Sequence, residues 1–193
     1  MTAVPTSPAE FFGEYVPAQL ALLRVALGQV SSPGAVVFDL GSAGAWSLRL
    51  AAGVPSVSLG VDADPLMRIT LSEADFAPII VAGAQKLAGE GAGRELMAAR
   101  LLTVDLERAR LLREAPGTVA LKLKSGELEH RVTMTLGAAS PGLAAPDCEI
   151  ECALEDLWAI QGGSKNPFEL LMDGKLRLSG KVELAMALGA ALG

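Results

Sequence analysis

Aromatic residues are scarce in this chain of 193 residues: they make up only 4% of it, whereas hydrophobic residues as a whole make up 51%. Aromatic side chains dominate the interior of most cores. Their scarcity leaves apolar surface to be covered by aliphatic side chains, by a bound apolar molecule or by a subunit interface. The chain is long enough to bury a sizeable core, as one domain or as two small ones that share a face.

Positive charge is also scarce. Sixteen Lys and Arg against 22 Asp and Glu give a net charge of −6, with no basic cluster, so no nucleic acid partner is expected. The longest apolar stretches, 76–84 and 182–193, are shorter than the about 20 residues that a membrane-spanning helix needs. Residues 1–8 lack the charged-then-apolar pattern of a signal peptide. We therefore expect a cytoplasmic protein without an integral membrane segment.

Residues that carry chemistry are few: the chain has two cysteines and one histidine. Cys148 and Cys152 fall in one expected strand, which separates them by about 13 Å and excludes a disulfide. With His130 they cannot form a zinc site unless carboxylates join them. His130 lies beside Glu129 at a strand end and has no evident partner for general base catalysis. We predict no catalytic residue, no metal and no cofactor, and therefore a protein that is not an enzyme.

Alternation of apolar and polar residues predicts antiparallel strands that have one face covered by helices. The expected strands are residues 34–40, 46–50, 67–71, 117–123, 128–136, 147–154 and 175–178. Helical periodicity predicts helices at residues 7–29, 72–87, 94–115 and 182–192. This order of elements is typical of an α+β fold with a mostly antiparallel sheet.

The two halves of the chain share a pattern at an offset of 83 residues, the distance from Gly34 to Gly117. The apolar positions of 36–40 match those of 119–123, and those of 67–71 match those of 150–154. Two segments with one offset favour an internal duplication. We predict a partial unit at residues 1–93 and a complete unit at residues 94–193, because only the second half continues into a further strand and helix.

Several short motifs lie in order and without a gap near the C-terminus. They are Asp147-Cys-x-Ile150, Asp156-Leu157, Gly163, Asn166-Pro167, Gly174-Lys-Leu-x-Leu-x-Gly180 and Leu184-Ala-Met186. With these motifs the stretch from about residue 95 to 193 resembles a complete domain of the sterol carrier protein 2 family. Residues 1–93 resemble only the front half of such a domain, because no Gly-Lys-Leu block follows Gly83.

The resemblance implies an apolar tunnel between a sheet and its helices, with a fatty acid, acyl-CoA, isoprenoid lipid or sterol as the partner. Inward strand positions and the C-terminal helices would line it. The expected ligand-binding residues are Leu121, Val132, Met134, Ile150, Trp158, Phe168, Leu171, Met172, Met186 and Leu188. Such a protein binds or transfers the lipid without chemical change.

Two alternatives remain at this stage. The segment Val36-Val-Phe-Asp-Leu-Gly-Ser-Ala-Gly-Ala45, followed by Asp62, resembles the cofactor-binding motif of S-adenosylmethionine-dependent methyltransferases. That motif requires a helix after the glycine-rich loop, and residues 46–50 alternate instead. The second alternative is a scaffold without a ligand, in which the apolar surplus forms a homodimer or holds another partner.

Overall fold

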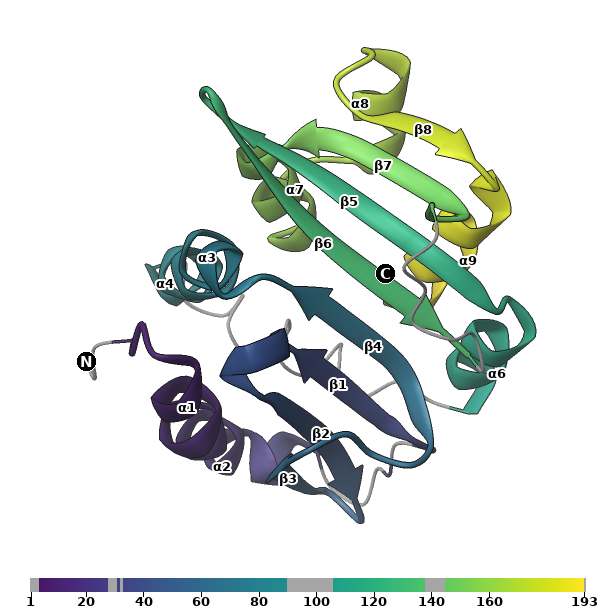
Figure 1. Cartoon of the computed structure of the whole chain (residues 1–193). Helices are drawn as coiled ribbons and strands as arrows, with labels where there is room; N and C mark the ends of the chain where they lie inside the picture. The colour runs from purple at the N-terminus through teal and green to yellow at the C-terminus, as the bar shows by residue number, and fades with distance from the viewer. Residues whose placement is uncertain (1–3, 28–30, 32, 90–105, 138–144, 193) are drawn as a thin grey trace.

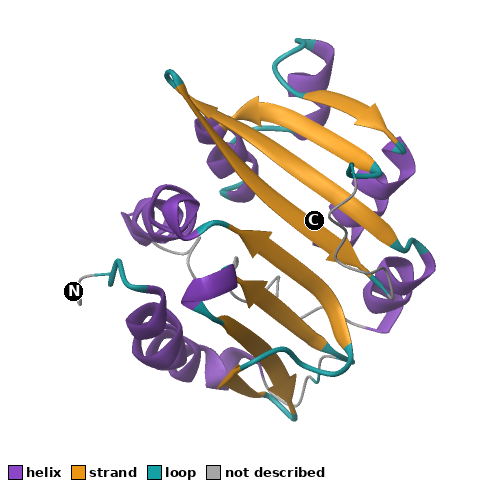
Figure 2. Cartoon of the chain, in the orientation of Figure 1, coloured by secondary structure: helices purple, strands orange, loops and turns teal. Residues whose placement is uncertain are grey.

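The computed structural model describes residues 4–27, 31, 33–89, 106–137 and 145–192. Strands from both halves of the chain form one continuous sheet, with the N-terminal strands at one end and the C-terminal strands at the other (Figure 2). In Figure 1 the C-terminal strands cross in front of helices α7 and α9. Within the described residues, no helix is long and apolar enough to cross a membrane.

The described part of the sheet has eight strands in the order β3-β2-β1-β4-β6-β5-β7-β8. Their bounds are β1 (Ala35–Asp39), β2 (Ala45–Ala51), β3 (Val54–Leu59), β4 (Pro65–Leu71), β5 (Gly117–Ser125), β6 (Leu128–Leu136), β7 (Cys148–Ala153) and β8 (Arg177–Gly180). Of the seven neighbouring pairs, only β1 with β4 and β5 with β7 are parallel. The predicted mostly antiparallel α+β sheet is therefore confirmed.

Helical segments occur before, between and after the strands. The N-terminal half contains α1 (Pro8–Glu10), the π-helical turn η1 (Phe11–Tyr15), α2 (Val16–Leu27), the 3₁₀ turn η2 (Gly41–Ala43), α3 (Glu73–Phe76), the π-helical turn η3 (Ala77–Val81) and α4 (Ala82–Gly89). The C-terminal half contains α6 (Leu106–Glu114), α7 (Leu154–Gln161), α8 (Pro167–Met172) and α9 (Val182–Leu192). Residues 94–105 of the expected helix 94–115 lie outside the described residues.

Three details differ from the sequence prediction. Strand β3 was not expected, since it contains Pro55 and two serines and most of it is exposed. Leu154 begins α7 instead of ending β7. The strand expected at 175–178 begins later, at Arg177, because the N–H groups of Lys175 and Leu176 bond back to the carbonyl of Leu170 and complete the C-terminal cap of α8.

The methyltransferase alternative is wrong, because its motif lies in a hairpin. The loop of residues 41–44 joins two antiparallel strands and is followed by β2, where the motif requires a helix. Asp62 forms an ion pair with Arg49, with 2.5 Å between Oδ1 and Nη2. The acid is therefore occupied by the protein itself.

Each half contains the same set of pairings. Strand β1 is antiparallel to β2 and parallel to β4, and β5 is antiparallel to β6 and parallel to β7. The parallel register differs by two residues, since Val36 pairs with Met67 whereas Val119 pairs with Cys148. A shift of two keeps the same face inward. The internal duplication itself stays a prediction.

The two halves join along β4 and β6. In the C-terminal half, the free edge of β7 is covered by the antiparallel strand β8, which follows the Gly-Lys-Leu block. In the N-terminal half, the corresponding edge of β4 is covered by β6, also antiparallel. An uncovered edge strand invites wrong pairing. The second half thus supplies the strand that the first half lacks.

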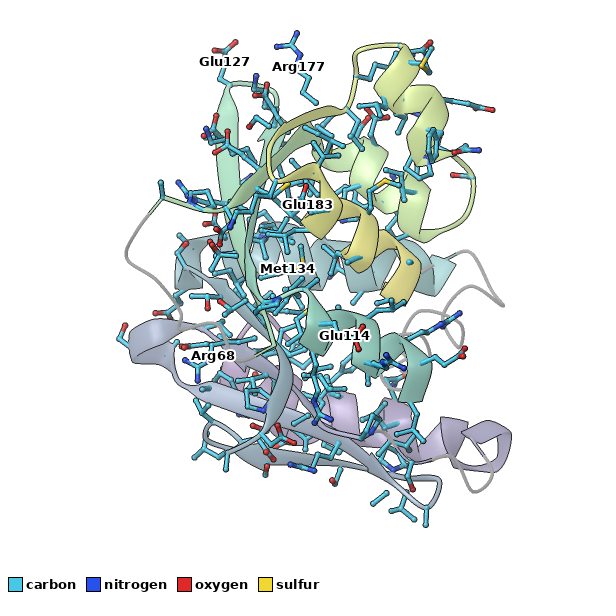
Figure 3. All side chains as sticks on the ribbon, turned by 90° about the vertical axis from the view of Figure 1, so that its right-hand side faces the viewer. Arg68, Glu114, Glu127, Met134, Arg177 and Glu183 are labelled. Atoms are coloured by element: carbon cyan, nitrogen blue, oxygen red, sulfur yellow. The ribbon has the colours of Figure 1, made fainter. Side chains whose placement is uncertain are left out.

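One face of the sheet is apolar and the other is polar. The apolar face includes Ile69, Met134 and Val119, which pair across β4, β6 and β5. In the side view of Figure 3, Met134 lies between the sheet and the helices, whereas Arg68 lies on the other side of the sheet. The polar face carries cross-strand ion pairs, Arg68 with Asp39, Lys122 with Glu149 and Lys124 with Glu151. The described helices pack against the apolar face, and Val37 and Ala120 on the face with the ion pairs are also buried.

Aromatic side chains fill the core of the N-terminal half. Phe12 stacks on Trp46 with 4.9 Å between ring centroids and lies 5.1 Å from Phe38 and 5.9 Å from Phe76. Phe11 adds contacts with Phe12 and Phe76. In the C-terminal half, the described core is aliphatic, apart from the partly buried Trp158. The few aromatic residues are thus concentrated where residues 1–93 fold.

Asp147 connects three elements of the C-terminal half. Its carboxylate accepts hydrogen bonds from the Lys181 ammonium before α9 (2.9 Å) and from the backbone N–H and hydroxyl of Thr118 in β5 (3.0 and 3.1 Å). Gly180 passes so close that a Cβ there would lie 2.2 Å from the Asp147 carbonyl oxygen, and its φ of +82° also favours glycine. Asp147 and Gly180, which belong to two of the family motifs, therefore meet where β7 begins and β8 ends.

We predict that Asp147→Asn lowers the free energy of unfolding at neutral pH by about 1 kcal/mol, a value reduced for partial exposure of the pair. The Lys181 ammonium, followed by the Thr118 donors, lowers the pKa of Asp147 to about 2. This stabilisation is present above the pKa of an unfolded Asp, about 3.9, and is lost as the pH falls through the folded value. Urea unfolding at several pH values should show the wild type and the variant converging between about pH 4 and 2. Asp173→Asn is the control, because Asp173 forms an exposed ion pair with Lys175, and it should change the free energy of unfolding little. A difference between wild type and Asp147→Asn that stays the same at all pH values would contradict this role of the Asp147 carboxylate.

Candidate functional site

A row of four aliphatic side chains crosses the apolar face of the C-terminal half. Leu121 in β5 pairs with Val132 in β6 and with Ile150 in β7, and Ile150 pairs with Leu178 in β8. We call these four residues the central row. Because paired residues point to the same side of a sheet, the central row forms one strip of apolar surface that faces the helices.

The central row keeps accessible surface where a packed core would have none. Leu121 and Ile150 are only partly buried, although they lie on the two middle strands of this half. Their neighbours two residues away on the same strands and the same face, Val119, Leu123 and Cys148, are 0% exposed. The accessible surface is therefore confined to the middle of the strands.

Helix α9 covers one side of the central row. Leu184 packs against Gly117 at the start of β5, where a Cβ would lie 2.7 Å from a Leu184 methyl group. Leu184, Leu188 and Ala191 are buried, which matches the spacing of an apolar helix stripe. The described part of the apolar stripe of α9 therefore packs back on the sheet.

Helix α7 covers the other side. It begins at Leu154, directly after β7, and Leu154 is buried, as are Leu123 and Cys152 near the ends of β5 and β7. Leu157, Trp158 and Ile160 are partly buried against the same core. The central row thus lies between the part of the sheet under α9 and the part under α7.

The structure divides the ten predicted ligand-binding residues into two groups. Six lie on the inner side of the C-terminal half and are buried or partly buried: Leu121, Val132, Met134, Ile150, Trp158 and Leu188. Four are exposed: Phe168 (65%), Leu171 (37%), Met172 (84%) and Met186 (58%). The structure brings the first group together on one face, and the ligand contact of all ten stays a prediction.

Three of the four exposed residues lie on α8, and the shortness of this helix explains their exposure. This helix has six residues, is capped by the Asn166 side chain and buries only Leu170. A short helix held by one side chain cannot turn its other apolar residues inward, so Phe168, Leu171 and Met172 face outward. Met186 lies on the side of α9 opposite its buried stripe.

Sequence reasoning missed two residues of this region. Leu178 completes the central row in β8, and Leu157 contributes to the surface of α7. Alternation in the Gly-Lys-Leu block could have identified Leu178, since it follows Leu176 with the period of a strand.

The two thiols and the imidazole of this half are buried in the structure. Burial raises the pKa of Cys152 to about 11 and also raises the pKa of Cys148, so both thiols stay protonated at neutral pH and are weak nucleophiles. His130 contacts Asp75 of the other half, with 2.9 Å between Nδ1 and Oδ1. In the part of the chain that the structure describes, no group of three or more His, Cys, Asp or Glu could hold a metal.

Comparison with known proteins identifies the family. Residues 97–193 match the sequence profile of the SCP-2 sterol transfer family. The chain belongs to this family. The matched residues contain the central row and helices α7, α8 and α9, so the SCP-2 match coincides with the half that carries the candidate site. No curated protein matches the chain.

Solved structures similar to this SCP-2 family member are sterol carrier proteins. Sterol carrier protein 2-like 2 from Aedes aegypti is 26% identical, with 43% of this chain and 86% of that chain covered and a TM-score of 0.34. Sterol carrier protein 2 from Yarrowia lipolytica is 19% identical over 59% of this chain and 94% of that chain, with a TM-score of 0.39. Sterol carrier protein domain 2 of Helicoverpa armigera is 16% identical over 60% of this chain and 84% of that chain, with a TM-score of 0.34.

We predict that Leu188→Ala destabilises the protein much more than Met186→Ala, because the two residues lie on opposite sides of α9. Leu188 is 6% exposed, so its truncation leaves a cavity and should lower the free energy of unfolding by about 2–4 kcal/mol. Met186 is exposed, and Met186→Ala should change stability by less than about 0.5 kcal/mol. Chemical denaturation of both variants is the measurement, and equal destabilisation would mean that the side of α9 carrying Met186 is also packed.

Proposed function

We propose that this SCP-2 family protein carries an apolar lipid, with the lipid tail lying on the central row between α7 and α9. The observation that carries the proposal is the accessible surface of Leu121 and Ile150 in the middle of the sheet. Candidate ligands are fatty acids, acyl-CoA, isoprenoid lipids and sterols. Lipid transfer is the family's function in broad terms, and the tunnel and its residues are our proposal.

The chemistry of the central row suits an acyl or isoprenoid tail. Its four members are aliphatic, and Met134 is an adaptable neighbour that accepts tails of different shape. Each CH₂ group that leaves water gains about 0.8 kcal/mol, so a long tail can bind tightly without polar contacts. Ligand sites of this kind are mostly apolar and have few polar groups.

We also propose that the lipid is bound without chemical change. The protonated thiols of Cys148 and Cys152 lie on β7, one of the strands that would contact the tail, and neither is activated for attack. Covalent catalysis needs an activated nucleophile. These two residues therefore act as small apolar side chains beside the site.

The two halves have different roles in this proposal. Residues 1–93 form a partial unit whose interior is filled by Phe12, Trp46 and Phe76. Residues 94–193 form the complete unit and bind the lipid next to aliphatic residues. The first half then serves to cover the edge of the sheet at β6 and to support the second.

A homodimer is the second candidate use of the apolar surplus. Phe168, Met172 and Met186 are exposed on α8 and α9. Apolar residues on a surface can mark an interface. Analytical ultracentrifugation of the wild type and of a Phe168→Ser, Met172→Ser variant tests this use. If α8 forms the interface, the wild type is a dimer and the variant is a monomer.

We predict that a set of lipids raises the melting temperature of the protein. A ligand that binds only the folded state stabilises it by RT ln(1 + [L]/Kd), about 2.7 kcal/mol when the ligand concentration is 100 times Kd. Fatty acids, acyl-CoA, quinones and sterols are tested in parallel, and native mass spectrometry of the purified protein checks for retained lipid. No shift with any class and no retained or exchangeable lipid would contradict the proposal.

We predict that Leu121→Trp blocks lipid binding while the protein stays folded, because the larger side chain occupies accessible space on the central row. Leu123→Trp is the matched control, two residues along the same strand and on the same face. Leu123 is 0% exposed, so its replacement overpacks the core and should cost about 1–3 kcal/mol or more of stability.

Affinity for a fluorescent fatty acid and the urea midpoint are measured for both variants. Unchanged affinity in a folded Leu121→Trp protein would place the site away from the central row. Strong destabilisation by Leu121→Trp would show that the middle of the strands is ordinary core.

A further inference from the structure

The seam between the two halves brings α4 of the first against α7 of the second. Gly83 in α4 lies against the indole of Trp158 in α7: a Cβ at Gly83 would lie 3.1 Å from the Trp158 Nε1 atom. The absence of a side chain at Gly83 is what allows the helix to approach the ring. Trp158 is partly buried and packs against the core that borders the central row.

Lys86 lies one turn after Gly83 on the same side of α4. Its Nζ atom is 5.0 Å from the centre of the Trp158 ring, within the range of a cation–π interaction. The other five lysines of the chain each lie within 4 Å of a carboxylate: Lys122, Lys124, Lys165, Lys175 and Lys181. Lys86 forms no ion pair with any carboxylate of the described residues.

The indole of Trp158 provides a second donor. No hydrogen bond joins its N–H to any acceptor in the described part of the chain, although a partly buried tryptophan usually has a partner. An ammonium group and an indole N–H therefore occur together at the edge of α7 that meets α4. Lys86 is exposed, so this edge is where a polar head group would remain in contact with water.

We propose that Lys86, which lies outside the residues matched by the family, is the counter-charge for the carboxylate head of a fatty acid bound at this site. This inference rests on the proposed lipid function and adds a head-group residue from the other half. The tail lies along the central row, and Trp158 holds the Lys86 ammonium at the seam. A sterol or another uncharged lipid gains nothing from this charge.

The test compares hexadecanoic acid with its methyl ester at about pH 8, where the acid is ionised. The two ligands have the same tail, so the ratio of their affinities reports on the head group alone. Isothermal titration calorimetry of the full chain should give about two- to fivefold tighter binding of the acid, the range for an exposed ion pair. Lys86→Gln should reduce this ratio to about one by weakening only the acid, and Lys86→Arg should restore it.

Lys124→Gln is the matched control, since it removes the same charge from the polar face, where Lys124 pairs with Glu151. It should leave the ratio unchanged. Equal binding of acid and ester by the wild type, or an unchanged ratio in Lys86→Gln, would overturn the role of Lys86 while leaving lipid binding intact. Binding of neither ligand would overturn the proposed function itself.

Discussion

The antiparallel pairing of β4 with β6 is the constraint on which the rest of the structure depends. It joins the last strand of the first half to the second strand of the second half, and so makes one sheet from two sets of strands. Met67, Ile69 and Leu71 come to lie beside Leu136, Met134 and Val132, so the apolar faces of the two halves become continuous. A slip of one residue in this register would turn every one of these side chains to the polar face.

Contacts beyond the sheet support this junction. His130 of β6 contacts Asp75 of α3, and the Arg113 guanidinium of α6 contacts Asp64, which precedes β4. Trp158 and Gly83 bring α7 against α4. Because each of these contacts crosses from one half to the other, the halves are coupled in stability as well as in position.

The distribution of aromatic and aliphatic residues gives the two halves different interiors. Rings of Phe11, Phe12, Phe38, Trp46 and Phe76 fill the first half in edge-on, tilted and stacked contacts. The described interior of the second half is aliphatic apart from Trp158, and the middle of β5 and β7 keeps accessible apolar surface. This difference explains why a site is proposed in only one half, although both halves share a pattern of strands.

The one-sided sheet also limits where polar chemistry can occur. Ion pairs of Arg68, Lys122 and Lys124 occupy the face away from the helices. On the inner face, burial keeps the two thiols protonated. Lys86 reaches the rim of the apolar region only because it comes from the other half and lies across the face of Trp158.

The sequence by itself determined the class of the fold, the family resemblance, most strands and three of the four residues of the central row, because alternation and short motifs are local properties of a chain. Leu121, Val132 and Ile150 could be assigned to one face in this way. Tertiary structure decided what local patterns do not contain: which strands are neighbours, that β6 covers the edge of β4, and that Lys86 meets Trp158. It also decided that Phe168, Leu171, Met172 and Met186 face outward, because the burial of an apolar side chain depends on what its helix packs against and not on its own hydrophobicity.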